Sequence, residues 1–407
     1  MVNETPDIQA KMVLFWHNHF ALQFLEIPDA RACYTYTKVL YTHAMGNFKD
    51  LTRAVTIDPA MLFYLNGRLN TKKAPDENYA REVMQLFSIG LVQLNADGTP
   101  RLSNGQPMDS YSAQDISQLA RVFTGWERDR ADAMDYAHVT RPMKHNAANF
   151  QSGDKTVLGT TIPGSLGGPE ALSLALDTLA NHPNVGPFMG RQLIQRFTMS
   201  HPSPAYVARV AARFNDNGAG VRGDLKAVWV AILLDDEARG PGSLQSTTFG
   251  KLREPMLRFV QWARTFGVTS AAGSWKIFEL NNAASQLGQS PLRSPSVFNF
   301  FRPGYVPPGT ALSASGATAP EFQLVNETTV GGYLNFMQSV IERGINCPNP
   351  GVPQAAYNNY AYDVQANVGG KIAQLGSRLI DSTAKKLAGE FFSSFGAAVS
   401  AANVATG

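Results

Sequence analysis

Two histidines and two glutamates are the side chains of this sequence whose types could form a metal site. His17 and His19 stand two residues apart, and Glu77 and Glu82 stand five apart further along the chain. Imidazole combined with carboxylate is a ligand set that suits zinc, iron or manganese. The four residues therefore predict a candidate divalent-metal site, and with it a metal-dependent hydrolase or oxidoreductase.

The spacing of the two histidines also allows an interpretation without a metal ion. On an α-helix, residues two apart point about 200° away from each other, so both cannot face one metal ion. On a strand or in a broken helix, His17 and His19 could do so. Otherwise one histidine bonds a backbone carbonyl in the core and the other lies at the edge of the apolar face. Both interpretations remain open at this point.

The two glutamates lie in residues 75–90, which read as one helix. Asp76 suits an N-cap, and Gly90 suits the left-handed residue that often follows a helix. Glu77 precedes Arg81 by four residues, which predicts an exposed ion pair. Glu82 lies nearer the apolar stripe. We therefore expect this helix to pack on the one that carries Trp16, with Glu82 buried and paired with a histidine.

No other catalytic motif stands out. Residues 164–167 lack the Gly-x-Ser-x-Gly spacing of a nucleophile elbow, and residues 153–156 match a phosphate loop only in part. The zinc-protease pattern His-Glu-x-x-His is absent from the sequence. Nucleophilic catalysis of these types is therefore not predicted.

Helical periodicity dominates the chain and predicts a mainly α fold: a multi-helix globular domain with long irregular loops and a separate C-terminal amphipathic helix. Short strands are expected at 138–139 and 156–158, and the aromatic residues of the loop at 289–316 should hold it against the helices. We expect a helical domain at 1–345, a Pro/Asn linker at 346–360, a helical tail at 361–396 and a low-complexity end at 397–407. The expected helices are 8–25, 30–44, 48–57, 60–65, 75–90, 113–126, 169–181, 185–199, 204–216, 224–234, 251–266, 275–287, 330–343 and 370–395.

Composition narrows the class of protein. Only 16% of the 407 residues are charged, below the roughly 25% of typical soluble domains, which favours a polar, uncharged surface and an exported protein. The net charge of +3 comes without a long basic run, so nucleic-acid binding is not predicted. No stretch of 18 apolar residues predicts a transmembrane segment, and residues 1–6 do not read as a signal peptide.

Several stretches together resemble one bacterial family, catalogued as domain of unknown function 1800, over about residues 8–343. The resemblance implies a helical domain, commonly periplasmic or extracellular, often encoded beside a sulfatase-like partner, with no established reaction. The stretches that carry it are Trp16-His17-Asn18-His19-Phe20, residues 77–82 with Leu86-Phe87 and Gly90, Thr124-Gly125-Trp126, residues 155–159, His182-Pro183, residues 251–255, Gly288-Gln289 and residues 294–298.

The tail carries a second resemblance. Residues 360–396 are similar to the last strand and helix of the carbon monoxide dehydrogenase G-subunit family, in which a long helix packs across a curved sheet. The preceding sequence does not predict such a sheet, so we expect few contacts between residues 365–395 and 8–343. The helix should then be highly mobile or self-associate through Phe391, Phe392 and Phe395.

Two functional classes follow. The first is a non-catalytic exported protein that acts with a partner, with the motif residues serving the core. The second is a metal-dependent enzyme that uses His17, His19, Glu77 and Glu82.

Overall fold

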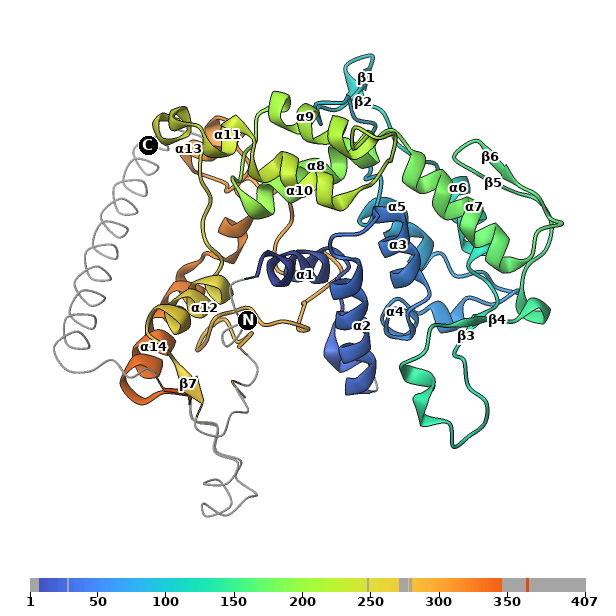
Figure 1. Cartoon of the computed structure of the whole chain (residues 1–407), viewed down its shortest axis with the longest axis horizontal. Helices are drawn as coiled ribbons and strands as arrows, with labels where there is room; N and C mark the ends of the chain where they lie inside the picture. Colours follow the sequence, from blue (N-terminus) through green and yellow to red (C-terminus); the bar gives the residue numbers. More distant parts are fainter. Residues whose placement is uncertain are drawn as a thin grey trace, which may run out of the picture. The chain divides into compact units, whose positions relative to one another are not determined.

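The mainly α architecture is confirmed. The computed structural model describes residues 7–27, 29–246, 249–270, 277, 280–345 and 364–365. These residues form fourteen α-helices, several 3-10 turns and four two-stranded antiparallel pairs, joined by long loops (Figure 1). None of the described helices is long and apolar enough to cross a bilayer.

The helices are α1 Ile8–His19, α2 Ala30–His43, α3 Phe48–Thr56, α4 Pro59–Tyr64, α5 Asn78–Gln85, α6 Ala113–Val122, α7 Gly168–Asn181, α8 Val185–Phe197, α9 Pro204–Asn215, α10 Leu225–Leu233, α11 Asp236–Arg239, α12 Pro255–Thr265, α13 Ala311–Ala314 and α14 Glu327–Arg343. The strand pairs are β1 Leu102–Ser103 with β2 Gln106–Pro107, β3 Trp126–Glu127 with β4 Lys144–His145, β5 Lys155–Val157 with β6 Thr160–Ile162, and β7 Thr269–Ser270 with β8 Val364–Gln365.

Two compact units interleave along the sequence. The larger unit comprises Thr5–Leu252 and Pro291–Gln323, and the smaller one includes Arg253–Ser290 and the chain from Leu324 onward. The smaller unit has its own core, to which α12 and α14 contribute Phe259, Met337 and Val340. Within it Gln289 donates to the buried carboxylate of Glu254.

Aromatic packing builds the core of the larger unit around α1. The indole N–H groups of Trp16 and Trp229 both donate to the backbone carbonyl of Ala44, each at 3.3 Å. This shared acceptor joins α1, the end of α2 and α10, which are far apart in sequence. The Trp16 ring also packs on Phe20 and Phe48.

Close helix packing positions α8, a helix that contributes to the candidate site described below. It packs against α9 and α10, which lie beside it in Figure 1. A Cβ at Gly190 of α8 would approach Val210 of α9 to 3.2 Å, so a glycine here permits the short interhelical distance. The opposite face of α8 is thereby left for other contacts.

Three predicted elements are shorter than expected or take another form. The first helix ends at His19 rather than residue 25, because Gln23 pairs with the backbone of Arg293. The helix expected at 75–90 spans only Asn78–Gln85. The expected strand at 138–139 is part of a 3-10 turn, Tyr136–Val139, because the Asp135 side chain accepts from the backbone of Ala137.

The helix expected at 275–287 does not form over its described residues 280–287, where the Asn282 side chain accepts from the backbone N–H groups of Ala284 and Ser285. The strand expected at 156–158 is confirmed as β5. The predicted linker at 346–360, the tail helix at 370–395 and its self-association lie outside the described residues, so they stay predictions.

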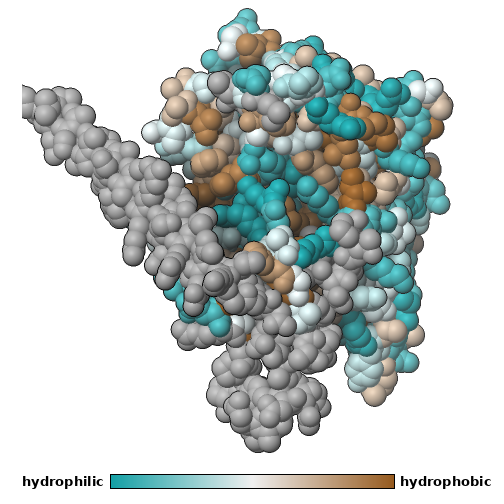
Figure 2. Space-filling model, turned by 60° about the vertical axis from the view of Figure 1, so that its left-hand side comes forward, coloured by the Kyte–Doolittle hydropathy of each residue, from teal (hydrophilic) through white to brown (hydrophobic). Residues whose placement is uncertain are grey.

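The surface has mixed polarity. On the face drawn in Figure 2, hydrophilic residues are interspersed with hydrophobic patches. Exposed apolar side chains include Leu25, Tyr34 and Met134, which are 69%, 72% and 71% exposed.

Candidate functional site

His17 is hydrogen-bonded to the backbone of a loop that is distant in sequence. Its Nε2 accepts a hydrogen bond from the backbone N–H of Leu292 at 3.0 Å, so this nitrogen carries no proton. The proton of the neutral ring is therefore on Nδ1, which is buried and has no hydrogen-bond partner among the described residues. Burial lowers the pKa of His17 to about 4, which keeps the ring neutral at physiological pH.

His19 is hydrogen-bonded to the backbone of the segment that follows α5. Its Nε2 donates to the backbone carbonyl of Phe87 at 3.1 Å, so this nitrogen is protonated. Burial lowers the pKa of His19 to about 4, although the bond to Phe87 opposes the shift. The two histidines are thus neutral and hold opposite tautomers, each chosen by a backbone group.

Glu82 is more buried than Glu77, as expected, but the predicted pairing of Glu82 with a histidine is wrong. Glu77 forms the predicted exposed pair with Arg81 at 3.0 Å. Glu82 is buried, at 9% exposed, yet its Oε2 has no partner in the described chain, and no hydrogen bond or ion pair joins it to His17 or His19. Burial raises the pKa of Glu82. Each histidine instead uses one ring nitrogen for a backbone group that the sequence pattern does not reveal.

A metal site at these four residues stays a prediction. In the part of the chain that the structure describes, no three His, Cys, Asp or Glu side chains are grouped so that they could hold a metal ion. Glu77 lies in an exposed pair, while His17 and His19 each use one ring nitrogen for a backbone group.

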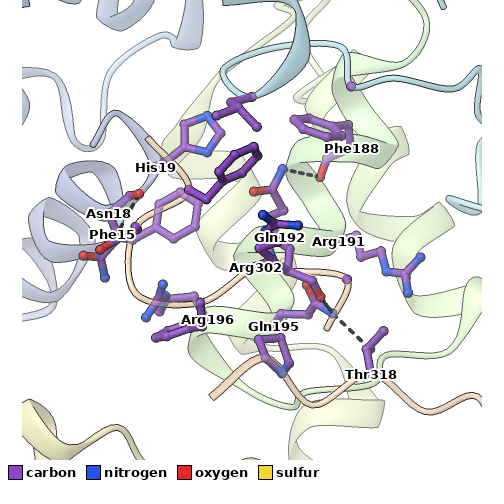
Figure 3. Close-up of a pocket in the computed structure, with 18 of the residues that line it drawn as sticks. Phe15, Asn18, His19, Phe188, Arg191, Gln192, Gln195, Arg196, Arg302 and Thr318 are labelled. Carbon is purple, nitrogen blue, oxygen red and sulfur yellow. Dashed lines mark hydrogen bonds between the residues drawn. The ribbon is translucent and has the colours of Figure 1, made fainter. Parts of the chain in front are cut away.

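A different set of residues forms a pocket of about 580 Å³ in the larger unit. Its floor is one face of α8, and its other walls come from α1, the chain after α5 and the loop at 297–304 (Figure 3). The lining combines aromatic and aliphatic side chains with amides and arginines. The polar and charged lining residues are Asn18, His19, Gln85, Arg191, Gln192, Gln195, Arg196, Asn299, Arg302, Thr318 and Glu321.

Three arginines make this pocket cationic. Arg196 stacks on Phe301 with its guanidinium carbon 4.5 Å from the ring centroid, and Arg302 stacks on Phe298 at 4.3 Å. Arg191 is half-buried, and no hydrogen bond, ion pair or ring contact joins its guanidinium to another described residue. Burial lowers the pKa of Arg191, because the side chain is held partly away from water.

The single carboxylate in the described lining forms an ion pair with a lysine outside that lining. Glu321 is 1% exposed, and its Oε1 lies 2.6 Å from Nζ of Lys251, which does not line the pocket. Lys251 also donates to the backbone carbonyls of Gln195 and Arg196, at the end of α8. Glu321 is thus paired with Lys251, and no ion pair joins Glu321 to Arg191.

The histidine motif holds the wall of this pocket in place. His17 accepts from Leu292, and the backbone carbonyl of Asn18 accepts from Nδ2 of Asn299 at 3.1 Å. Asn299 has a positive φ of 60° and its Oδ1 accepts from the backbone of Phe300, which fixes the turn of the loop. The motif therefore positions the segment that presents Phe298, Phe301 and Arg302.

Two buried polar atoms in the pocket lining have no hydrogen-bond partner within the described chain. One is Nδ2 of Asn18 and the other is Oε1 of Gln195, whose amide nitrogen already donates to Ser200, Pro303 and Thr318. Native proteins leave few such atoms, and they concentrate where water or a ligand binds.

Arginines, amides and aromatic rings predominate among the side chains described as lining the pocket. The residues described as its lining include no Ser, Cys, Lys, Asp or Tyr side chain, and His19 is neutral and bonded to Phe87. Thr318 supplies the hydroxyl of this lining, and its Oγ1 donates to the backbone carbonyl of Ser200 at 2.8 Å and lies 3.2 Å from Nδ1 of His201. Guanidinium groups, amides and aromatic rings are instead the groups that recognise organic anions.

The sequence pattern missed Arg191, Gln192, Gln195 and Arg196. One signal was available: α8 places Gln192 and Gln195 on the same side as Phe188, so polar side chains interrupt an apolar face. The convergence of the loop at 297–304 on this face could not be predicted, because it is separated from α8 by about a hundred residues.

Comparison with known proteins agrees with the sequence motifs. A family model described as "Protein of unknown function (DUF1800)" matches residues 1–404. No curated protein and no solved structure matches the chain. The resemblance of the tail to the carbon monoxide dehydrogenase G-subunit family is not confirmed, while the match to the first family extends through the tail. The chain therefore belongs to the DUF1800 family.

Proposed function

We propose that this protein binds a small organic anion, without chemical conversion, in the pocket on α8. The observation that carries the proposal is Arg191, a half-buried guanidinium in a cavity with no partner among the described residues. Desolvating a cation is costly unless an opposite charge or hydrogen-bond acceptors compensate it. An anionic ligand would supply both.

The size and lining of the pocket support a small-molecule ligand. Ligand sites commonly enclose about 300–1,000 Å³ and combine apolar walls with a few polar groups. The cavity of about 580 Å³ lies within this range. Phe15, Phe188 and Val297 supply apolar surface, and the arginines supply charge.

The motifs that carry the family resemblance also reach this pocket. Asn18 and His19 belong to the first motif, Leu86 and Gly90 to the second, and Phe298 to the last, and all five line the cavity. A further motif residue, Lys251, neutralises the carboxylate of Glu321 in the lining. Stretches far apart in sequence thus contribute to one cavity, which supports its role as the functional site.

We also propose that the protein is exported to the periplasm or the extracellular space and acts with a partner of the sulfatase-like kind. The support is the family resemblance and the low share of charged residues. Fractionation of cells that express the full-length protein, followed by affinity capture with a co-encoded sulfatase-like protein, tests both statements. Retention in the cytoplasm or failure to co-purify would contradict them.

The alternative of a metal-dependent hydrolase or oxidoreductase at His17, His19, Glu77 and Glu82 is separated from this proposal by elemental analysis. A stoichiometric divalent metal in the purified protein, lost on replacement of His17 or Glu82, would support the enzyme. Absence of such a metal would favour the binding protein over the enzyme.

The experiment that tests anion binding is a thermal-shift and calorimetric panel. Sulfate, phosphate, benzoate and pimelate are compared with chloride at equal ionic strength. We expect at least one organic anion to raise the melting temperature and to bind with one-to-one stoichiometry. The variant Arg191→Gln should lose this binding, and Arg53→Gln, at an exposed arginine of α3, should retain it. Equal melting temperatures with all anions and chloride would overturn the proposal.

A further inference from the structure

We infer that the ligand of this pocket is a hydroxylated organic acid, whose oxyanion binds Arg191 and whose hydroxyl group donates a hydrogen bond to Oε1 of Gln195. The inference rests on the proposed function and adds the chemical class of the ligand. It follows from an amide oxygen that has no hydrogen-bond partner among the described residues and lies one helical turn from the arginine.

The orientation of the Gln195 amide is fixed by its neighbours. Gln195 is 3% exposed and lines the cavity. Its amide nitrogen donates to the backbone carbonyls of Ser200 and Pro303, both at 3.0 Å, and to Oγ1 of Thr318 at 3.1 Å, the bond dashed in Figure 3. A backbone carbonyl can only accept, so the nitrogen and not the oxygen must face these groups. Oε1 of Gln195 therefore points away from them.

The oxygen of this amide needs a donor that the described chain does not supply. Oε1 of Gln195 is buried and has no hydrogen-bond partner among the described residues. The hydroxyl of Thr318 does not serve it, because its proton is donated to the backbone carbonyl of Ser200 at 2.8 Å. A buried acceptor without a donor is costly, and native proteins keep few of them. A hydroxyl group of a ligand in the cavity would supply the missing donor.

Arg191 and Gln195 can contact the same small molecule. They are four residues apart on α8, so their side chains leave the same face of the helix with Cβ atoms about 5–6 Å apart. No hydrogen bond, ion pair or ring contact joins the Arg191 guanidinium to another described residue. A cationic donor thus lies one turn from a neutral acceptor. An oxyanion and a hydroxyl group, separated by a few bonds, are complementary to this arrangement.

The donor of the ligand is a hydroxyl rather than an ammonium group. An ammonium group at Oε1 of Gln195 would lie within about one helical turn of the Arg191 guanidinium, and like charges at this separation repel. A hydroxyl group donates the same hydrogen bond without a charge. Phe15, Phe188 and Val297 supply apolar surface for the carbon skeleton between the polar groups. The ligand class is therefore hydroxy acids and not amino acids.

The test is isothermal titration calorimetry of the full-length protein with two series of hydroxy acids. One series contains the meta and para hydroxybenzoates, and the other contains short unbranched alkanoates with a terminal hydroxyl. Each acid is compared with its parent acid, which lacks the hydroxyl, with its methyl ether, which keeps the oxygen without the proton, and with its amino analogue. We expect at least one hydroxy acid to bind at least tenfold more tightly than these three relatives.

Replacing Gln195 with Met tests whether this residue recognises the hydroxyl. Gln195→Met removes Oε1 at similar side-chain length, so the best hydroxy acid and its parent acid should bind this variant with equal affinity. Damage to the fold would weaken both ligands by the same factor and leave their ratio unchanged. Gln338→Met, at an exposed glutamine of α14, should keep the wild-type ratio. A thermal melt reports how much stability Gln195→Met loses with the three acceptors of its amide nitrogen.

The ligand series on the wild type separates this inference from the proposed function. Parent acids that bind as tightly as the hydroxy acids would overturn the inference and leave anion binding intact, and tighter binding of the amino analogues would also overturn it. An unchanged ratio in Gln195→Met would contradict the role of Gln195. No binding of any acid would overturn the proposed function itself. The wild-type comparisons decide the ligand class even where Gln195→Met does not fold.

Discussion

Nε2 of His17 accepts the backbone N–H of Leu292 at 3.0 Å, across 275 residues of sequence. The two residues share a compact unit, and this bond begins the segment that continues into the pocket wall at Phe298 and Phe301. The histidine motif at the start of the chain thus acts on the pocket through a loop near its end.

Replacing His17 should therefore weaken ligand binding, although His17 itself does not line the pocket. We expect His17→Ala to reduce the affinity for an anionic ligand, because the Leu292 N–H loses its acceptor and the wall loses an anchor. His17→Gln offers a carbonyl oxygen to the same N–H and should recover most of the affinity. Calorimetry with the best ligand of the panel measures both. Equal affinities for wild type and His17→Ala would show that the bond does not position the wall.

Stability should fall between pH 6.5 and pH 4 because of the two buried histidines. Both have a folded-state pKa of about 4 against an ordinary value of 6.5, so in this window the unfolded chain binds protons that the folded protein does not. Each histidine should cost roughly 3 kcal/mol of unfolding free energy by pH 4, and nothing above pH 6.5. Urea melts across this range should show a shallower fall for the variants His17→Gln and His19→Gln.

The buried carboxylate of Asp58 makes stability fall as the pH rises, which is opposite to the effect of the two histidines. Each histidine variant is therefore compared with the wild type at the same pH. The Asp58 carboxylate is 3% exposed and caps α4 by accepting from Ala60, and burial raises its pKa to about 7. Its folded state holds a proton that the unfolded chain releases between about pH 4 and 7, so this residue lowers stability as the pH rises. Asp58→Asn keeps a capping oxygen and should stabilise the protein above pH 7, with little effect below pH 4. A destabilised variant at pH 8 would contradict the assignment.

Glu82→Gln should change stability by less than about 1 kcal/mol, because Glu82 is buried but has no partner among the described residues that would be left uncompensated. The sequence had suggested a buried pair with a histidine, whose disruption would cost roughly 3–5 kcal/mol. Glu77→Gln, in the exposed pair with Arg81, should change stability by less than about 0.5 kcal/mol. A loss of several kcal/mol in Glu82→Gln alone would reveal a partner for this carboxylate.

The Lys251–Glu321 pair should show strong coupling. Its charged atoms lie 2.6 Å apart, with side chains 16% and 2% exposed, so Glu321→Gln leaves a largely buried ammonium beside the pocket. We expect this variant to lose about 3 kcal/mol of stability, and the double variant Lys251→Met, Glu321→Gln to lose less than the single one. Denaturant melts of the wild type, the two single variants Lys251→Met and Glu321→Gln, and the double variant complete the cycle. Additive losses would show that the two charges act independently.

The periodic helices were predictable from the sequence, and the site was not. Helices such as α2, α9 and α14 end within three residues of their predicted bounds, because their apolar stripes and capping residues are local signals. The end of α1 depends on the pairing of Gln23 with Arg293, and the pocket wall depends on bonds from Leu292 to His17 and from Asn299 to Asn18. Those contacts have no local signature.

The motif histidines were correctly chosen as important residues, but their role was open. Whether His17 and His19 meet a metal or the backbone depends on Leu292 and Phe87, which belong to segments that the spacing within residues 16–20 does not address. The pocket arginines were passed over because a single Arg on a helix ordinarily points to solvent. Only the packing of α8 on α9 and α10 shows where Arg191 lies.

Whether this pocket binds an anion is tested most directly by replacement of Arg191. Replacing it with Met removes a desolvated cation of similar length, so the ligand-free variant should be about 1 kcal/mol more stable than wild type, or about 2 °C higher in melting temperature. The same variant should lose the rise in melting temperature that the best organic anion gives to wild type. If Arg191 is retained for binding, its replacement should stabilise the ligand-free protein and remove the stabilisation that the ligand gives. A variant that is less stable when empty, or that retains the full ligand-induced rise, would contradict the claim that this pocket binds an anion through Arg191.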